Sequence, residues 1–167
     1  AAKAMVWALV AMAIYVTWRF EWGFALGAFL ALVHDAMMTI GLSHAFGFSI
    51  NMAIVAALLT IIGYSVNDTI VIFDRIRENL IGMRKESFPQ IIDISLNQTL
   101  SRTFITSFTV WLSVIILYFF TMGSGVGIES FAFPLIIGLI AGTYSTIYIA
   151  SPILIEWYRN ARPVVAK

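Results

Sequence analysis

The sequence has no cysteine and few charged residues. The absence of cysteine among its 167 residues excludes disulfides, thiolate nucleophiles and cysteine-containing metal sites. Charged residues make up 11% of the chain, whereas a soluble domain has about 25%. A soluble domain of this size could not cover its surface with so few charges. The net charge of +1 provides no overall field that would attract nucleic acid or an acidic substrate.

Apolar side chains are present in excess. Hydrophobic residues make up 60% of the chain and aromatic residues 14%, a composition that also excludes a disordered chain. A helix needs about 20 mostly apolar residues to cross a bilayer, and five segments meet this requirement. The sequence therefore predicts an all-α, polytopic transmembrane helix bundle with spans at residues 4–20, 24–46, 50–73, 103–122 and 131–157.

The distribution of basic residues predicts the orientation of these spans. The links on one side carry Arg19, Arg75, Arg77, Arg84, Lys85, Arg102, Arg159, Arg162 and Lys167. The links on the other side carry only Lys3. Because Lys and Arg are concentrated in cytoplasmic loops, we expect the N-terminus of this sequence outside and the C-terminus in the cytoplasm.

The longest link, residues 74–101, belongs to the cytoplasmic side. Ser87 can cap a helix that begins near Pro89 and carries Ile91 and Ile92. We expect an amphipathic helix that lies on the inner membrane surface. The alternative is a solvated loop.

The chain opens with Ala1 and continues directly into an apolar stretch that has no small-residue cleavage pattern. We interpret this stretch as a membrane span and not as a signal peptide. A first span that starts at once on the outer side leads us to expect a further segment upstream.

Two aspartates occur inside predicted spans, where ionisable residues are costly and point to function. Asp68 lies in the third span, about 9 Å along the helix from Asp74. Tyr64 and Ser65 precede Asp68 by about one turn, so they share its face, and Asn67 adjoins it. Asp35, the second aspartate, follows His34 in the second span, and neither has an evident partner of opposite charge.

The fourth span carries a polar stripe of its own. Its members recur at intervals of four, three and four residues, which places them on one helix face: Arg102, Thr106, Thr109 and Ser113. A guanidinium near Asp68 would favour the carboxylate, whereas burial would favour the protonated acid. The pair is therefore a candidate proton relay. The alternative is a static bond between helices.

Enzymatic patterns are not found in the sequence. The only two histidines, His34 and His44, do not form a zinc-binding helix motif, and no phosphate-binding loop occurs. Gly123-Ser124-Gly125 lies in an outer link without a nearby histidine. Asp68 is not preceded by the glycine of intramembrane aspartyl proteases. We expect no enzyme activity, no cofactor and no metal. The small residues Gly138, Ala141, Gly142 and Ser145 indicate close helix packing.

The third span and its exit resemble a known family. The run Gly63-Tyr64-Ser65-Val66-Asn67-Asp68-Thr69-Ile70-Val71-Ile72-Phe73-Asp74-Arg75-Ile76-Arg77-Glu78-Asn79 closely resembles the signature of the SecF family of bacterial protein-export proteins. The related SecD family has an Asp-Ala-Asn pattern in the matching helix. His34-Asp35 and the run from Gln98 to Thr103 are also similar to the SecF family.

This resemblance implies a half-unit of the resistance–nodulation–division superfamily membrane fold. The SecF pattern has six spans with a periplasmic domain after the first. This sequence lacks that first span and the domain. The family's intramembrane acidic and basic positions correspond to Asp68 and Arg102.

The resemblance also implies a location and partners. It places the chain in the bacterial cytoplasmic (inner) membrane, in contact with membrane lipid. The implied partners are SecD, the SecYEG channel and a translocating unfolded polypeptide, with the proton-motive force assisting translocation. One alternative is a structural assembly subunit with proton coupling in its partner. Another is a small-molecule exporter of the same superfamily.

Overall fold

The chain folds into an all-α bundle in a computed structural model that describes residues 2–124, 127–159 and 163. Its elements are α1 (Ala2–Arg19), α2 (Trp22–Ala45), α3 (Met52–Gly82), α4 (Phe88–Thr121), α5 (Glu129–Ser145), a π-helical turn (Thr146–Ala150) and α6 (Ser151–Trp157). The predicted fold class is confirmed. Three residues named in the sequence analysis lie outside the described residues: Gly125, Arg162 and Lys167.

Four helical segments of the described chain are long and apolar enough to cross a membrane by length and composition. They are α2, α3, α4 and the continuous stretch Glu129–Trp157. The helix α1 coincides with the first predicted span but is not among these four. Its crossing of the membrane stays a prediction.

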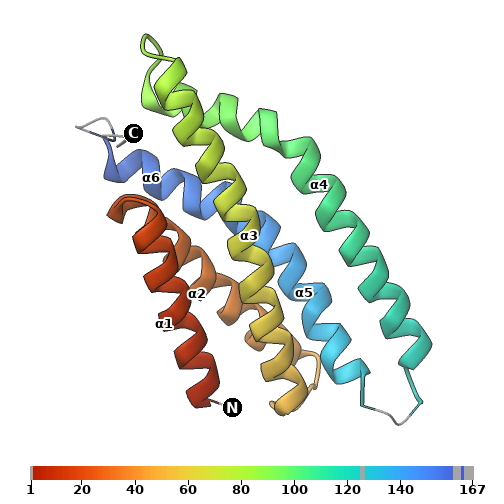
Figure 1. Ribbon diagram of the computed structural model, residues 1–167. Coiled ribbons are helices and arrows are strands. Elements are labelled where there is room, and N and C mark those ends of the chain that lie inside the picture. The colour runs from red at the N-terminus through yellow and green to blue at the C-terminus, as the bar shows by residue number, and fades with distance from the viewer. Residues whose placement is uncertain (1, 125–126, 160–162, 164–167) are drawn as a thin grey trace.

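The helix α5 lies at the centre of the bundle and packs against α2, α3 and α4. The helix α1 packs mainly on α2 and α3, at the opposite side from α4 (Figure 1). The links at residues 20–21 and 83–87 lie toward one end of the molecule, and the link at residues 46–51 lies at the other (Figure 1). We call the first end the charged end, because Arg19, Arg75 and Arg77 lie toward it.

Most of the long link predicted at residues 74–101 is helical, while the positions at which the third and fourth spans leave the membrane stay predictions. The helix α3 does not end at residue 73 but continues to Gly82, and α4 begins at Phe88 instead of residue 103. The link between them is only residues 83–87. The segment expected to form a helix around residues 87–101 is therefore helical, as the first part of α4. Its position on the inner membrane surface stays a prediction.

Packing between the two extensions explains why they stay helical. Ile76 of α3 is fully buried in the same apolar cluster as Ile91 and Ile92 of α4. The side chain of Asn79 also donates a hydrogen bond to Ser95 Oγ at 2.8 Å. Ser87 is the N-cap of α4, as predicted, and its backbone N–H donates to the side-chain oxygen of Gln90 at 2.9 Å.

The last helical stretch contains a π-helical turn at Thr146–Ala150. Pro152 has no backbone N–H to donate to the preceding turn, and the hydroxyl of Ser151 donates to the carbonyl of Thr146 at 3.1 Å. Gly27 of α2 meets this turn closely, since a Cβ at Gly27 would lie 3.1 Å from the carbonyl oxygen of Ala150. The turn thus fixes the contact between α2 and the C-terminal helices.

Tyr158 connects the end of α6 to the first link. Its hydroxyl donates to Glu21 Oε2 at 2.8 Å. Burial raises the pKa of Tyr158, and the hydrogen bond to Glu21 acts in the same direction. The phenol therefore stays a proton donor, and α6 stays attached to the start of α2.

Candidate functional site

Asp68 lies in the middle of the contact between α3 and α4. It is 5% exposed, and its Oδ2 atom accepts a hydrogen bond from the hydroxyl of Ser107 on α4 at 3.3 Å. The helix α3 brings it there because Ser65, Asp68, Thr69 and Ile72 fall on the buried side of the helix. The buried carboxyl group of Asp68 is thus hydrogen-bonded by one neutral side-chain donor, the hydroxyl of Ser107.

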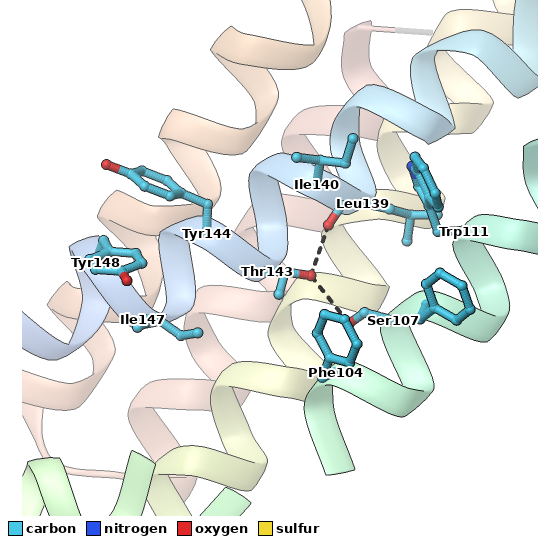
Figure 2. A pocket seen from close by; sticks show the side chains of 10 residues that line it. Phe104, Ser107, Trp111, Leu139, Ile140, Thr143, Tyr144, Ile147 and Tyr148 are labelled. Atoms are coloured by element: carbon cyan, nitrogen blue, oxygen red, sulfur yellow. Dashed lines mark hydrogen bonds between the residues drawn. The ribbon is translucent and has the colours of Figure 1, made fainter. Parts of the chain in front are cut away.

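Ser107 is the centre of a hydroxyl cluster that joins three helices. Its oxygen accepts from Tyr64 of α3 at 3.4 Å and from Thr143 of α5 at 3.2 Å. Figure 2 shows Thr143 between Ser107 and the carbonyl of Leu139, which Thr143 reaches at 3.0 Å. Because a hydroxyl carries one proton, Thr143 donates to one of these two acceptors at a time. The cluster therefore has more than one possible hydrogen-bond pattern.

An apolar groove borders the cluster. It has a volume of about 400 Å³ and lies between α4 and α5, with Ser107 and Thr143 among its lining residues. Phe104, Trp111 and Tyr148 are three of the five aromatic side chains along it (Figure 2). The hydroxyl cluster thus lies next to an otherwise apolar surface.

The structure does not bring Arg102 into an ion pair with Asp68 among the described residues. Arg102 is exposed on α4. It lines a cleft of about 380 Å³ between α3 and α4, together with Asp74 and Glu78. Asp68 and Arg102, the two members of the predicted relay, therefore lie on adjacent helices but are not bonded to each other.

The predicted polar stripe of α4 is not the face that packs on Asp68. Arg102, Thr106, Thr109 and Ser113 are all exposed. The hydroxyl of Thr106 donates to the carbonyl of Arg102 in its own helix at 2.9 Å. The buried polar residues of α4 form a second stripe at intervals of four: Ser95, Thr99, Thr103 and Ser107. Sequence reasoning missed Ser107, although this regular spacing was available as a signal.

Two of the residues expected to lie beside Asp68 form no side-chain hydrogen bond with it among the described residues. Ser65 donates its hydroxyl to Asp35, not to Asp68. Asn67 is exposed. Tyr64 does reach the site, through Ser107. Thr143 was not anticipated, because nothing in the sequence indicates which residue of the last span would face the third and fourth.

Asp35 forms a second buried carboxyl site, between α2 and α3. It is 0% exposed, and Ser65 Oγ donates to its Oδ2 atom at 2.6 Å. His34 Nδ1 lies 3.2 Å from the other carboxyl oxygen. Gly142 of α5 leaves room for this site, since a Cβ there would lie 3.6 Å from Asp35 Oδ2 and 3.2 Å from Ser65 Cβ. The small residues Gly138, Ala141, Gly142 and Ser145 are all buried and serve helix packing, as predicted.

The two carboxyl sites connect α3 to different helices. One pairs Asp68 with Ser107 of α4, and the other pairs Asp35 of α2 with Ser65 of α3. Within the described residues, no group of three or more His, Asp or Glu side chains could hold a metal ion. The arrangement thus contains two buried carboxyl groups whose hydrogen bonds connect neighbouring helices.

Comparison with known proteins gives consistent matches over nearly the whole chain. The profile of the family described as "Protein export membrane protein SecD/SecF, C-terminal" matches residues 1–160. A protein translocase subunit SecF from Desulfurispirillum indicum is 48% identical over 157 residues, covering 92% of this chain and 49% of that protein. A protein translocase subunit SecDF from Brucella abortus is 47% identical over 154 residues, covering 92% of this chain and 20% of that protein.

A solved structure matches the fold. The crystal structure of SecDF from Thermus thermophilus, described as a translocon-associated membrane protein, superimposes with a TM-score of 0.81 at 40% sequence identity. The match covers 89% of this chain and 20% of that one. The chain spans about half the length of the SecF relatives it matches.

Proposed function

The chain belongs to the SecD/SecF family of protein-export membrane proteins, and from this we propose that it is the membrane part of a subunit that uses the proton-motive force to assist protein translocation. The observation that carries the proposal is the buried carboxyl group of Asp68, which is hydrogen-bonded to one hydroxyl of α4 and has no ion pair among the described residues. In a membrane, the gain or loss of a proton strongly alters the free energy of such a group, because its charge is costly to bury.

The hydroxyl cluster provides a way for that proton to affect the helices. When Asp68 is ionised, Ser107 donates to it and accepts from Tyr64 or Thr143. When Asp68 is protonated, it can donate to Ser107, whose own proton then turns to the oxygen of Thr143. Thr143 in turn keeps its bond to the carbonyl of Leu139. Protonation would thus reverse two hydrogen bonds, the one between Ser107 and Asp68 and the one between Thr143 and Ser107.

In this proposal, Arg102 influences whether Asp68 is protonated. A guanidinium that came close to Asp68 would favour its ionised form, although no ion pair joins the two side chains among the described residues. The exposed position of Arg102 allows the guanidinium to approach or leave the carboxyl group. Asp35, with His34, is the reserve candidate for the proton path, because it is also a buried carboxyl group.

The partners and orientation form part of the same proposal. The relatives are named as subunits of a protein translocase, and one of them combines SecD and SecF in one chain. We therefore expect association with SecD and with the SecYEG channel, and an unfolded polypeptide as the transported molecule. The excess of Lys and Arg at the charged end supports a cytoplasmic position for that end in the bacterial inner membrane.

The exchange Asp68→Asn tests the proposal in the full-length parent protein. Asparagine keeps the shape of the side chain but cannot carry the proton. We expect the variant to assemble with SecD yet to lose gradient-driven export in inverted membrane vesicles. Normal export by an assembled variant would favour the alternative of a structural assembly subunit. The relatives reported above are all named translocase subunits, which disfavours the small-molecule exporter.

A further inference from the structure

A polar cleft opens between α3 and α4 near the charged end. Its volume is about 380 Å³, and its polar lining consists of Asp74, Arg75, Glu78, Gln98, Thr99 and Arg102. Some of these groups are bonded to one another, since Arg75 donates to Gln98 at 2.7 Å and forms an ion pair with Glu78. A cleft lined by so many charged and amide groups favours water over lipid.

The cleft extends to within about one helical turn of Asp68. Its remaining lining residue, Val71, follows Asp68 by three positions on α3. On the opposite wall, Thr99 lines the cleft, and Ser107, the donor to Asp68, lies eight residues further along α4. Thr103 is midway between these two on the same buried face, about 6 Å along the helix from each.

The hydroxyl of Thr103 differs from its neighbours on α4. The hydroxyls of Ser95, Thr99, Thr106 and Thr109 each donate to a carbonyl of their own helix. Thr103 is 3% exposed, and its Oγ1 atom has no hydrogen-bond partner among the described residues. A buried hydroxyl without a protein partner is a position where an ordered water molecule is expected.

We infer that this cleft is a hydrated vestibule through which protons reach Asp68 from the charged end, and that Thr103 is the positioning residue for its innermost water. This inference rests on the proposed function, because it assumes that Asp68 exchanges protons. Water held by Thr103 would lie between the cleft and Ser107. A proton leaving a hydronium ion there would pass to the oxygen of Ser107, whose own proton would move to the Asp68 carboxylate. The hydronium becomes water, and the carboxylate becomes a carboxylic acid.

Labelling of single cysteines tests whether the vestibule carries water. The sequence has no cysteine of its own, so Thr103→Cys can be compared with Phe104→Cys in the full-length parent, with any cysteines elsewhere in the parent removed. Phe104 is 66% exposed on the outside of the bundle, where lipid is expected. A small charged methanethiosulfonate reagent added at the charged end should modify the first variant and spare the second. An unreactive Thr103→Cys, or equal reaction of both variants, would overturn the inference.

Proton flux in proteoliposomes tests the role of Thr103. Thr103→Val keeps the side-chain shape but removes the hydroxyl, so we expect flux to fall about tenfold, as for the loss of one hydrogen bond. Thr103→Ser should restore it. Thr106→Val is the matched control, because that exposed hydroxyl bonds only to its own helix, and flux should be unchanged. Normal flux in Thr103→Val would remove Thr103 from the path.

The two experiments separate this inference from the proposed function. If Asp68→Asn conducts protons normally, the proposed function fails. The labelling of Thr103→Cys would still decide whether the cleft contains water.

Discussion

Ser107 on α4 donates its hydroxyl to the buried carboxyl group of Asp68 on α3, at 3.3 Å. The same hydroxyl accepts from Tyr64 and Thr143, so the carboxyl group is connected to α5 as well. A proton taken up by Asp68 would therefore alter contacts among three helices.

The exchange Ser107→Ala should impair proton coupling. It removes the donor to Asp68 without adding bulk, and a hydrogen bond to a charged group contributes about 1.5–3 kcal/mol. We expect gradient-driven export to fall about tenfold or more at matched protein levels. Thr106→Ala, one residue away on the exposed face, should leave export unchanged. Equal losses in both variants would show that Ser107 has no special role.

Exchanges at Arg102 test its charge separately from its shape. Arg102→Met removes the cation that favours the ionised form of Asp68, so the carboxyl group should hold its proton too tightly and export should fall. Arg102→Lys keeps the charge but loses the planar guanidinium, and an intermediate rate is expected. The measurement is gradient-driven export in membrane vesicles. Full activity in Arg102→Met would exclude Arg102 from the relay.

Gly142 should be intolerant of a larger side chain. A Cβ at this position would lie 3.2 Å from Ser65 Cβ, next to the bond between Ser65 and Asp35. Gly142→Ala should therefore destabilise the fold by about 1–3 kcal/mol through overpacking, seen as a lower midpoint of thermal unfolding in detergent. At Gly63 of α3, apart from the adjacent backbone of its own helix, no atom of the described residues lies within 4 Å of an added Cβ, so Gly63→Ala should be neutral or stabilising. A stable Gly142→Ala would show that α5 can move away from this site.

Much of the fold could be predicted because helix formation in a membrane depends on local hydrophobicity. The N-cap Ser87 and the small-residue face around Gly142 were also correct. The extensions of α3 and α4 could not be predicted, because their helical state depends on mutual burial of residues such as Ile76 and Ile91. A charged run alone does not distinguish a loop from the end of a long helix.

The site was only partly predictable for a similar reason. Sequence periodicity showed that α4 has polar stripes, but two stripes occur one residue apart, through Thr106 and through Ser107. Only the packing of α4 on α3 shows which stripe faces Asp68. In the same way, Ser65 lies near Asp68 in sequence but bonds to Asp35, because the direction of its side chain brings it to α2.

The orientation predicted from charge can be tested by labelling from the two sides of the membrane. Single cysteines at Lys85, in the link of residues 83–87, and at Gly47, in the link of residues 46–51, should react with an impermeant reagent from opposite sides. We expect Lys85→Cys to react from the cytoplasmic side. Reaction of both from one side would contradict the topology.

The most direct test of proton coupling is proton flux in proteoliposomes that contain the full-length protein together with SecD, the proposed partner, compared between the unmodified protein and Asp68→Asn. The exchange replaces the carboxyl group with an amide that cannot take up and release the proton. If this carboxyl group carries the protons, flux should fall to the level of empty vesicles. Asn67→Ala, an exposed neighbour, should conduct normally. Flux in Asp68→Asn equal to that of the unmodified protein would contradict the account and move the proton path to Asp35 or to the partner subunit.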